Sequence, residues 1–455
     1  MTAAGLPVGP LVSWYGDDFT GAAAQMEAMS LAGLPAVLFF DVPTSQQRAK
    51  FAGYRGIGFA GIARSKSPTW MAENLPRAFR SLAEVGAPIS QYKVCSTLDS
   101  SPQVGSIGRA IEIALPYFSA DWVPLFVAAP PMGRYQLFAN LFATAGGVGY
   151  RLDRHPLSCH PVTPMLEADV RLHLAKQTNL KIGLVDYPNL RSGCGAEMLA
   201  AQISAGARIV ALDAIDDESL AAAGELMWER RAARTFAVGS QGIAYALIAY
   251  FRRIGLLQAS ESAFRRGKVA RMAVVSGSCS QITSGQITWA ENHGFQPIRI
   301  DPRAALDVSA WNAEIGWVTE RAISAVSDGK DPLIFSARGP EDPAVREFLE
   351  ALAIARADQT AVNEAIGRGL GDVLNTLIRR TNIRRAVIAG GDTSGHGAAS
   401  LGIYALTLAA ATVPGAALFQ AHSEDALLDR LEIALKGGQM GTPDYFGQIK
   451  DGGIS

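Results

Sequence analysis

The hydrophobic pattern at the start of the chain predicts a strand, a helix and a second strand. An apolar run at 11–15 is followed by a turn at 16–21 and by a helical stretch at 22–32, which Gly33 ends. Another apolar run at 35–40 then repeats the strand pattern. A strand–helix–strand unit of this kind predicts a parallel sheet with helices on its faces.

Short apolar runs continue to alternate with helical stretches along the chain. We expect further strands at 122–129, 181–186, 207–213, 235–238, 274–275, 332–336 and 386–389, and one from 431 into a glycine loop that ends at 441. Between the strands predicted at 235–238 and 274–275, a polar segment at 256–268 lacks a clear hydrophobic period. The strand–turn–helix pattern restarts after it. We therefore predict two α/β domains, 1–260 and 261–455, each a mostly parallel sheet with helices on both faces.

Polar side chains gather where the first predicted strands end. Asp17 and Asp18 follow the first strand, and the functional site of a parallel sheet lies at the carboxyl ends of its strands. Two adjacent carboxylates are more than a helix N-cap needs. They could bind a metal ion, bind a hydroxyl group of a substrate or act as a general base, and these roles stay open. Arg64 follows another strand-like run and suits a carboxylate ligand, although an exposed solubilising charge fits its spacing as well.

The richest polar stretch of the first half is 92–108. Its hydroxyl and charged side chains would suit a polyhydroxylated acid, and an ordinary Ser/Pro-rich connector is the alternative. The candidate ligands in it are Lys93, Ser96, Asp99 and Ser100. A G-x-G-x-x-G match at 56–61 is discounted, because the segment itself has the alternation of a strand and no helix starts within it.

A second kind of site is predicted near the end of the chain. The run 386–389 is followed by Gly390, Gly391, Asp392, Thr393 and Ser394, and then by small and aliphatic residues at 398–411 that are typical of a buried helix. A glycine turn at a helix N-terminus can bind phosphate through backbone N–H groups, with Asp392 as a candidate Mg²⁺ ligand. A plain helix turn with Asp or Ser as N-cap is the alternative.

A similar turn follows the strand at 274–275, where Ser276, Ser278 and Ser280 cluster before a helix at 283–293. Neither Gly-Lys pair is followed by Ser or Thr, so there is no Walker A motif, and the protein-kinase signature is absent too. If a nucleotide binds, it does so on turns of another type.

Composition narrows the class of protein. Lys+Arg is 41 and Asp+Glu is 42, so no basic excess argues for nucleic acid. The four cysteines form no C-x-x-C pair, which indicates neither a disulfide framework nor a zinc site. His155 and His160 lack a third ligand at a useful spacing. We see no secretory signal and no membrane span, so a cytoplasmic enzyme is expected; a homodimeric assembly stays open.

Five stretches together resemble the four-carbon acid sugar kinase family, and they run over almost the whole chain. They are Gly16-Asp-Asp-Phe-Thr-Gly21, Lys93-Val-Cys-Ser-Thr-Leu-Asp-Ser100, Ser276-Gly-Ser-Cys-Ser280, Gly390-Gly-Asp-Thr-Ser394 and Leu435-Lys-Gly-Gly438. The resemblance implies a sugar-acid-binding N-terminal domain, an ATP-binding C-terminal domain and an active site in the interdomain cleft. The second stretch is closer to the 3-oxo-tetronate branch of the family than to the threonate and erythronate branch.

The resemblance also implies roles for these residues. Asp18, Arg64 and the 93–100 run would bind substrate, and Ser278, the 391–394 turn and Gly438 would bind ATP. We expect Asp18, or else Asp99, to orient the attacking hydroxyl, with Mg²⁺ accompanying ATP. Two alternatives stay open: a sugar-acid-binding protein without catalysis, and a nicotinamide-dependent dehydrogenase.

Overall fold

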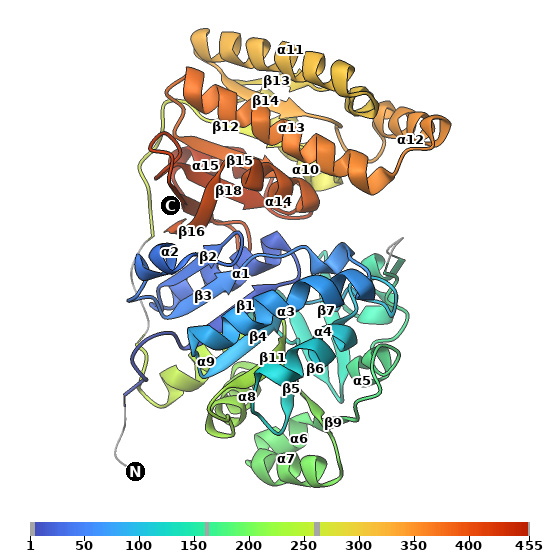
Figure 1. The fold of residues 1–455 in the computed structure, drawn as a ribbon, viewed down its shortest axis with the longest axis vertical. Helices are drawn as coiled ribbons and strands as arrows, with labels where there is room; N and C mark the ends of the chain where they lie inside the picture. Colours follow the sequence, from blue (N-terminus) through green and yellow to red (C-terminus); the bar gives the residue numbers. More distant parts are fainter. Residues whose placement is uncertain (1–4, 160–162, 259–263, 454–455) are drawn as a thin grey trace. The chain divides into compact units, whose positions relative to one another are not determined.

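The structure is a computed structural model, described here for residues 5–159, 163–258 and 264–453, without the side chains of 157, 159, 391–394 and 396. The chain divides into two compact units, 1–262 and 263–455 (Figure 1). The boundary predicted between 260 and 261 falls outside the described residues. Among the described helices, none is long and apolar enough to cross a membrane.

The first unit is built on a parallel sheet. Within the described residues its strands run in the order β2-β3-β1-β4-β11-β5-β10-β9, and every pair is parallel. The strands are β1 (Val12–Gly16), β2 (Ala36–Phe39), β3 (Gly56–Phe59), β4 (Ile89–Lys93), β5 (Val123–Phe126), β9 (Ile182–Val185), β10 (Ile209–Leu212) and β11 (Thr235–Gly239). The strands predicted in this half of the chain are confirmed.

Helices cover both faces of this sheet. Trp14 and Tyr15 are neighbours on β1 and therefore point to opposite faces. The Trp14 ring nitrogen donates to the carbonyl of Ala22 on one face, and the Tyr15 ring packs edge-on against Phe79 on the other. The helices are α1 (Phe19–Leu31), α2 (Ser45–Ala49), α3 (Pro68–Val85), α4 (Ile107–Ala114), α5 (Val170–Leu174), α6 (Tyr187–Arg191), α7 (Gly195–Ser204), α8 (Asp217–Glu229) and α9 (Gly242–Arg253).

A small antiparallel sheet in the first unit was not predicted. It consists of β6 (Arg134–Leu137), β7 (Asn140–Ala145) and β8 (Val148–Arg151), in that order. The buried carboxylate of Asp213, just after β10, accepts hydrogen bonds of 2.6 and 3.0 Å from the backbone N–H groups of Phe138 and Ala139. The turn between β6 and β7 is therefore anchored by a residue far away in the sequence.

The second unit has a mixed sheet. Within the described residues the order is β13-β14-β12-β15-β18-β17-β16; the first five strands are parallel, and β17 is antiparallel to both of its neighbours. The strands are β12 (Ala273–Ser276), β13 (Phe295–Arg299), β14 (Asp331–Phe335), β15 (Arg385–Ala389), β16 (Ile403–Ala410), β17 (Leu418–Ser423) and β18 (Glu432–Lys436).

Helices pack on this sheet as well. Val274 and Val387 belong to a buried cluster with Ile287 and Phe446, and Val275, the neighbour of Val274, is equally inaccessible. Both faces of the sheet are therefore covered. The helices are α10 (Gln281–Glu291), α11 (Val308–Ser327), α12 (Pro343–Ala355), α13 (Gln359–Arg380), α14 (Gly391–Ser400) and α15 (Tyr445–Asp451).

The prediction of a buried helix at 398–411 is wrong. Helix α14 ends at Ser400, Gly402 takes a left-handed φ of 69°, and the following residues form strand β16. Nearly every residue of β16 is buried, so the run has no polar alternation that would have identified a strand. The segment is a strand because it pairs with β17, which is distant along the chain from the turn at 390.

Candidate active site

The predicted substrate residues of the first unit meet at one edge of its sheet. The last residues of β1 and β11, Gly16 and Gly239, both lie in register with Lys93 of β4. The chain continues in step beyond these strands, because Asp17 N–H donates to the carbonyl of Lys93 at 2.9 Å. The side chains that follow β1 and β4 are therefore neighbours, as expected for the carboxyl ends of parallel strands.

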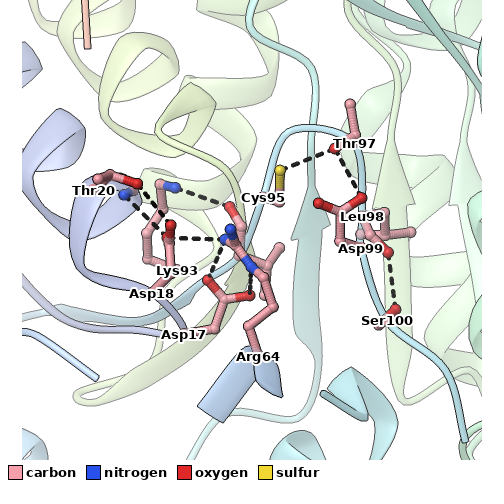
Figure 2. Close-up of polar contacts among 12 residues, drawn as sticks. Asp17, Asp18, Thr20, Arg64, Lys93, Cys95, Thr97, Leu98, Asp99 and Ser100 are labelled. Atoms are coloured by element: carbon pink, nitrogen blue, oxygen red, sulfur yellow. Dashed lines mark hydrogen bonds and ion pairs between the residues drawn. The ribbon is translucent and has the colours of Figure 1, made fainter. Parts of the chain in front are cut away.

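Arg64 joins the two predicted aspartates (Figure 2). It lies in a single 3₁₀ turn, Ala63–Ser65, shortly after β3, and its backbone N–H donates to the carbonyl of Asp17 at 3.0 Å. Its guanidinium donates to both oxygens of Asp17, at 2.7 and 3.2 Å, and to Oδ1 of Asp18 at 2.9 Å. The Asp17 side chain is only 2% exposed, whereas Arg64 and Asp18 retain 25% and 22%.

The two carboxylates differ in their electrostatics. Burial raises the pKa of Asp17 to about 6, against the opposing effect of the Arg64 guanidinium. Burial acts in the same direction on Asp18, but there the charges of Arg64 and Lys93 prevail and lower its pKa. Burial also lowers the pKa of the Lys93 ammonium. Asp18 is therefore the carboxylate that stays ionised and partly accessible.

Asp18 also begins helix α1. As N-cap it accepts the backbone N–H of Gly21 at 3.0 Å, and its other oxygen accepts the hydroxyl of Thr20 at 2.8 Å. A Cβ at position 21 would lie 2.3 Å from Asp18 Oδ1 and 2.9 Å from Lys93 Nζ, so a glycine is needed there. The N-cap role and a role toward substrate are compatible, because a carboxylate has more lone pairs than these contacts use.

The 95–100 loop is held by its own polar groups. The Thr97 hydroxyl lies 2.9 Å from Cys95 Sγ and donates to Asp99 Oδ1 at 3.1 Å. Leu98 has a left-handed φ of 56°, and the Ser100 hydroxyl donates to its carbonyl at 2.9 Å. Two further candidates, Ser96 and Asp99, are half-buried. The loop has a defined shape, which an unstructured connector would lack.

Two residues that sequence reasoning missed support this loop. His173 Nε2, on α5, lies 2.9 Å from the Ser100 hydroxyl, and Gln177 donates to the same hydroxyl at 2.9 Å. Burial lowers the pKa of His173 to about 4, so its imidazole is neutral near pH 7. Nothing in the sequence spacing points to these residues, because they lie more than 70 positions from the loop that they contact.

The second unit has a comparable edge. The last residue of β12, Ser276, pairs with Ala389 of β15, and Ala389 pairs with Lys436 of β18. Beyond the strands, Gly277 N–H donates to the Ala389 carbonyl at 3.0 Å and Gly390 N–H donates to the Lys436 carbonyl at 2.8 Å. The structure therefore brings together the ends of three segments that sequence reasoning proposed for the nucleotide.

Hydroxyl groups and a glycine turn interlock at this edge. Thr283 Oγ1 donates to Ser278 Oγ at 3.0 Å and to the Gly438 carbonyl at 3.2 Å, and the Ser280 hydroxyl also donates to the Gly438 carbonyl. A Cβ at position 438 would lie 2.8 Å from Ser278 Oγ. Close approach of the backbone is therefore possible only with glycine at this position.

Lys436 is a third residue that sequence reasoning did not select. Its ammonium donates to Thr283 Oγ1 and to the Gly437 carbonyl, both at 3.0 Å, and to the Gly438 carbonyl at 3.3 Å. Burial lowers its pKa to about 8. The available signal was a lysine at a strand end, immediately before two glycines.

The predicted phosphate turn starts helix α14. Its N-cap is Gly390, with φ 124°, and no side chain caps the helix. The first N–H groups of a helix have no intrahelical acceptor, so those of this turn could donate to a ligand. The side chains of Asp392, Thr393 and Ser394, which follow Gly391, lie outside the described residues.

Metal ligands do not gather elsewhere in the part of the chain that the structure describes. There, no group of three or more His, Cys, Asp or Glu side chains could hold a metal ion. Of the two histidines considered, His155 is buried in the first unit and His160 lies outside the described residues.

In comparisons with known proteins, each of the two units matches a family of its own. A family described as a sugar-binding N-terminal domain matches residues 12–247, and one described as a nucleotide-binding C-terminal domain matches 273–446. The 3-oxo-isoapionate kinase of Paraburkholderia graminis is 47% identical, with 99% of this chain and 96% of that protein covered. The 3-oxo-tetronate kinase of Cupriavidus necator is 31% identical, with 98% of each covered.

Solved structures have the same fold. A protein of Salmonella typhimurium matches with a TM-score of 0.78, over 96% of this chain and 98% of its own. A protein of Haemophilus influenzae matches with a TM-score of 0.71, over 96% and 99%. Each is 23% identical, which supports the fold alone. From the family matches and the full-length relatives, the chain belongs to the four-carbon acid sugar kinase family.

Proposed function

We propose that this protein is an ATP-dependent kinase that phosphorylates a hydroxyl of a 3-oxo sugar acid. The observation that carries the proposal is the 47% identity to a 3-oxo-isoapionate kinase over 99% of the chain, which includes both units. That substrate is the first candidate; 3-oxo-tetronate is the second, because relatives that act on it are about 30% identical over nearly the full length.

The substrate would bind at the edge of the first unit. We assign it to Asp17, Asp18 and Arg64 together with the loop residues Lys93, Ser96, Asp99 and Ser100. Their support is geometric: ionised and hydroxyl groups from three strand ends meet there, and the Asp18 side chain is 22% exposed. Such a set can bind several hydroxyl groups of one small polar molecule.

The nucleotide would bind at the edge of the second unit, on Ser276, Ser278, the 390–394 turn and Gly438. The first turn of α14 has N–H groups free of helical acceptors, and glycines at 390 and 438 allow close approach. ATP supplies the phosphoryl group, and Mg²⁺ neutralises phosphate charge. Since Mg²⁺ in kinases is usually held by one or two carboxylates and the phosphates, Asp392 alone would suffice as protein ligand.

Asp18 would orient the attacking hydroxyl. It stays ionised because Arg64 and Lys93 lower its pKa, which makes it a hydrogen-bond acceptor and only a weak base. In phosphoryl transfer, positioning and charge neutralisation supply most of the rate, so a weak base is adequate. Asp99 is the second candidate for this role.

A coupled ADP-release assay over 3-oxo-isoapionate, 3-oxo-tetronate, threonate and erythronate tests the proposal. We expect turnover with a 3-oxo acid, and little with the acids that lack the oxo group. Binding of a sugar acid with no ADP release from any of the four would favour a non-catalytic binding protein instead. The G-x-G-x-x-G match at 56–61 does not support the dehydrogenase alternative, because Gly56–Phe59 is strand β3 and not a phosphate-binding turn.

A further inference from the structure

The proposed substrate carries a carboxylate, and the cations beside Asp18 are already engaged. Arg64 directs three hydrogen bonds at the two aspartates. Lys93 is 1% exposed, and its ammonium donates to the Val94 carbonyl at 2.9 Å. The charges of Asp17 and Asp18 therefore offset those of Arg64 and Lys93, and a further cation at this edge would favour binding of the substrate carboxylate.

Arg134 is a cation at the same edge of the sheet. It begins β6, and its backbone exchanges hydrogen bonds of 2.9 and 3.2 Å with Ala129, which follows the end of β5. Strand β5 pairs with β11, and β11 pairs with β4, where Gly239 is in register with both Phe126 and Lys93. Two strand spacings, about 10 Å, therefore separate β5 from the strand that leads into the substrate loop.

Among the described residues, the contacts of Arg134 hold its side chain but give its charge no carboxylate partner. One terminal nitrogen, Nη1, donates to the carbonyls of Met132, Gly133 and Thr144, at 3.2 to 3.3 Å. Its Nε is buried and has no hydrogen-bond partner, and in the described part of the chain Arg134 makes no ion pair. Nη2, the third nitrogen, makes no hydrogen bond to another described residue.

A half-buried cation without a carboxylate partner is unfavourable, and at the carboxyl edge of the sheet it is placed to bind an anionic ligand. Arg385, which is buried more deeply at 2% exposed, is paired with Glu432. The ionisable group of the substrate loop that interacts electrostatically with Arg134 is Cys95. Burial raises the pKa of that thiol to about 11, so it is neutral at pH 7 and does not supply the missing charge.

We propose that Arg134 binds the carboxylate of the sugar acid and so selects acids over neutral polyols. The inference rests on the kinase activity proposed above. A guanidinium fixed at one nitrogen offers its remaining N–H groups in a plane that matches a carboxylate, which a lysine does not. The small sheet β6-β7-β8 then has a function, because it holds this arginine beside the substrate loop.

The test compares one acid with its neutral counterpart. Of the four acids in the assay above, the one that the wild-type enzyme turns over best is used together with its carboxamide. We expect the wild-type enzyme to favour the acid in kcat/KM by about 100-fold, the effect of one good charge-assisted contact. In R134Q this preference should fall to less than about 10-fold, mainly through KM for the acid, and R134K should recover part of it.

The ratio of the two kcat/KM values does not depend on the fraction of folded enzyme, so partial misfolding of R134Q leaves the test valid. R55Q is the matched control: Arg55 is also half-buried and donates to backbone carbonyls, those of Gly9 and Pro7, but it precedes β3 at the opposite edge. R55Q should keep the wild-type ratio. An unchanged ratio in R134Q would overturn this inference alone, whereas a wild-type enzyme that turns over none of the acids would overturn the proposed function and this inference with it.

Discussion

Arg64 holds the carboxylate of Asp17 through two hydrogen bonds, 2.7 and 3.2 Å long, although Asp17 is almost completely buried. The pair is 47 positions apart in sequence and is brought together by the parallel strands β1 and β3. The same guanidinium reaches Asp18, so one cation controls the charge of two neighbouring carboxylates with different exposures. The predictions for the first unit follow from this arrangement.

Replacing Asp18 by asparagine should reduce kcat about 100-fold or more while KM for ATP stays within a factor of about three, because the group that orients the hydroxyl loses its charge. Asparagine is as good an N-cap as aspartate, so helix α1 should keep its start, and the thermal midpoint should fall only by what the charge of Asp18 contributes beside Arg64 and Lys93. Steady-state kinetics and a melting curve check both parts. An enzyme with full turnover would remove Asp18 from the reaction and leave Asp99 as the candidate.

The stability of the first unit should depend on pH through Asp17. Burial raises the pKa of this carboxyl to about 6 in the folded protein, above its ordinary value of 3.8. The folded state therefore binds the proton more tightly than the unfolded chain, and the stability that protonation confers is complete below about pH 4 and lost as the pH rises through about 6.

In D17N the amide at position 17 does not titrate, so its contribution to stability does not change with pH. The unfolding free energy of the wild type relative to D17N should fall by on the order of 2 kcal/mol between pH 4 and pH 7. Urea denaturation at a series of pH values measures the difference. A difference that stays flat or grows with pH would mean that Arg64 keeps Asp17 ionised throughout.

Two adjacent glycines offer a matched pair of variants in the second unit. A Cβ at 438 would lie 2.8 Å from Ser278 Oγ, whereas a Cβ at 437 would meet its nearest atom, on Met440, at 3.5 Å. We expect G438A to raise KM for ATP about 10-fold or more with KM for the sugar acid unchanged, and G437A to behave like the wild type. Equal effects of the two substitutions would argue against a nucleotide at this turn.

Turnover should require a divalent cation. Removal of metal with a chelator should abolish ADP release, and added Mg²⁺ should restore it, because the phosphate charge must be neutralised. D392N should raise the Mg²⁺ concentration for half-maximal rate about 10-fold. Full activity after chelation, or an unchanged Mg²⁺ requirement in D392N, would contradict the assignment.

The sequence alone determined the alternation of strands and helices and the positions of the polar turns. Apolar runs such as 11–15 and 386–389 are recognisable because backbone periodicity and glycine turns act over only a few residues. The paired aspartates and the serine turn after β12 could therefore be placed at strand ends. The family resemblance, which the comparisons confirm, also came from local stretches.

Only the tertiary structure decided which of these turns meet and what their side chains contact. That β16 is a strand depends on its pairing with β17, and that Ser100 is held by His173 depends on a helix more than 70 residues away. The same holds for Arg134, because the partners of its guanidinium among the described residues, three backbone carbonyls, are set by the fold around it. Long-range packing and burial set these features, and no local period in the sequence records them.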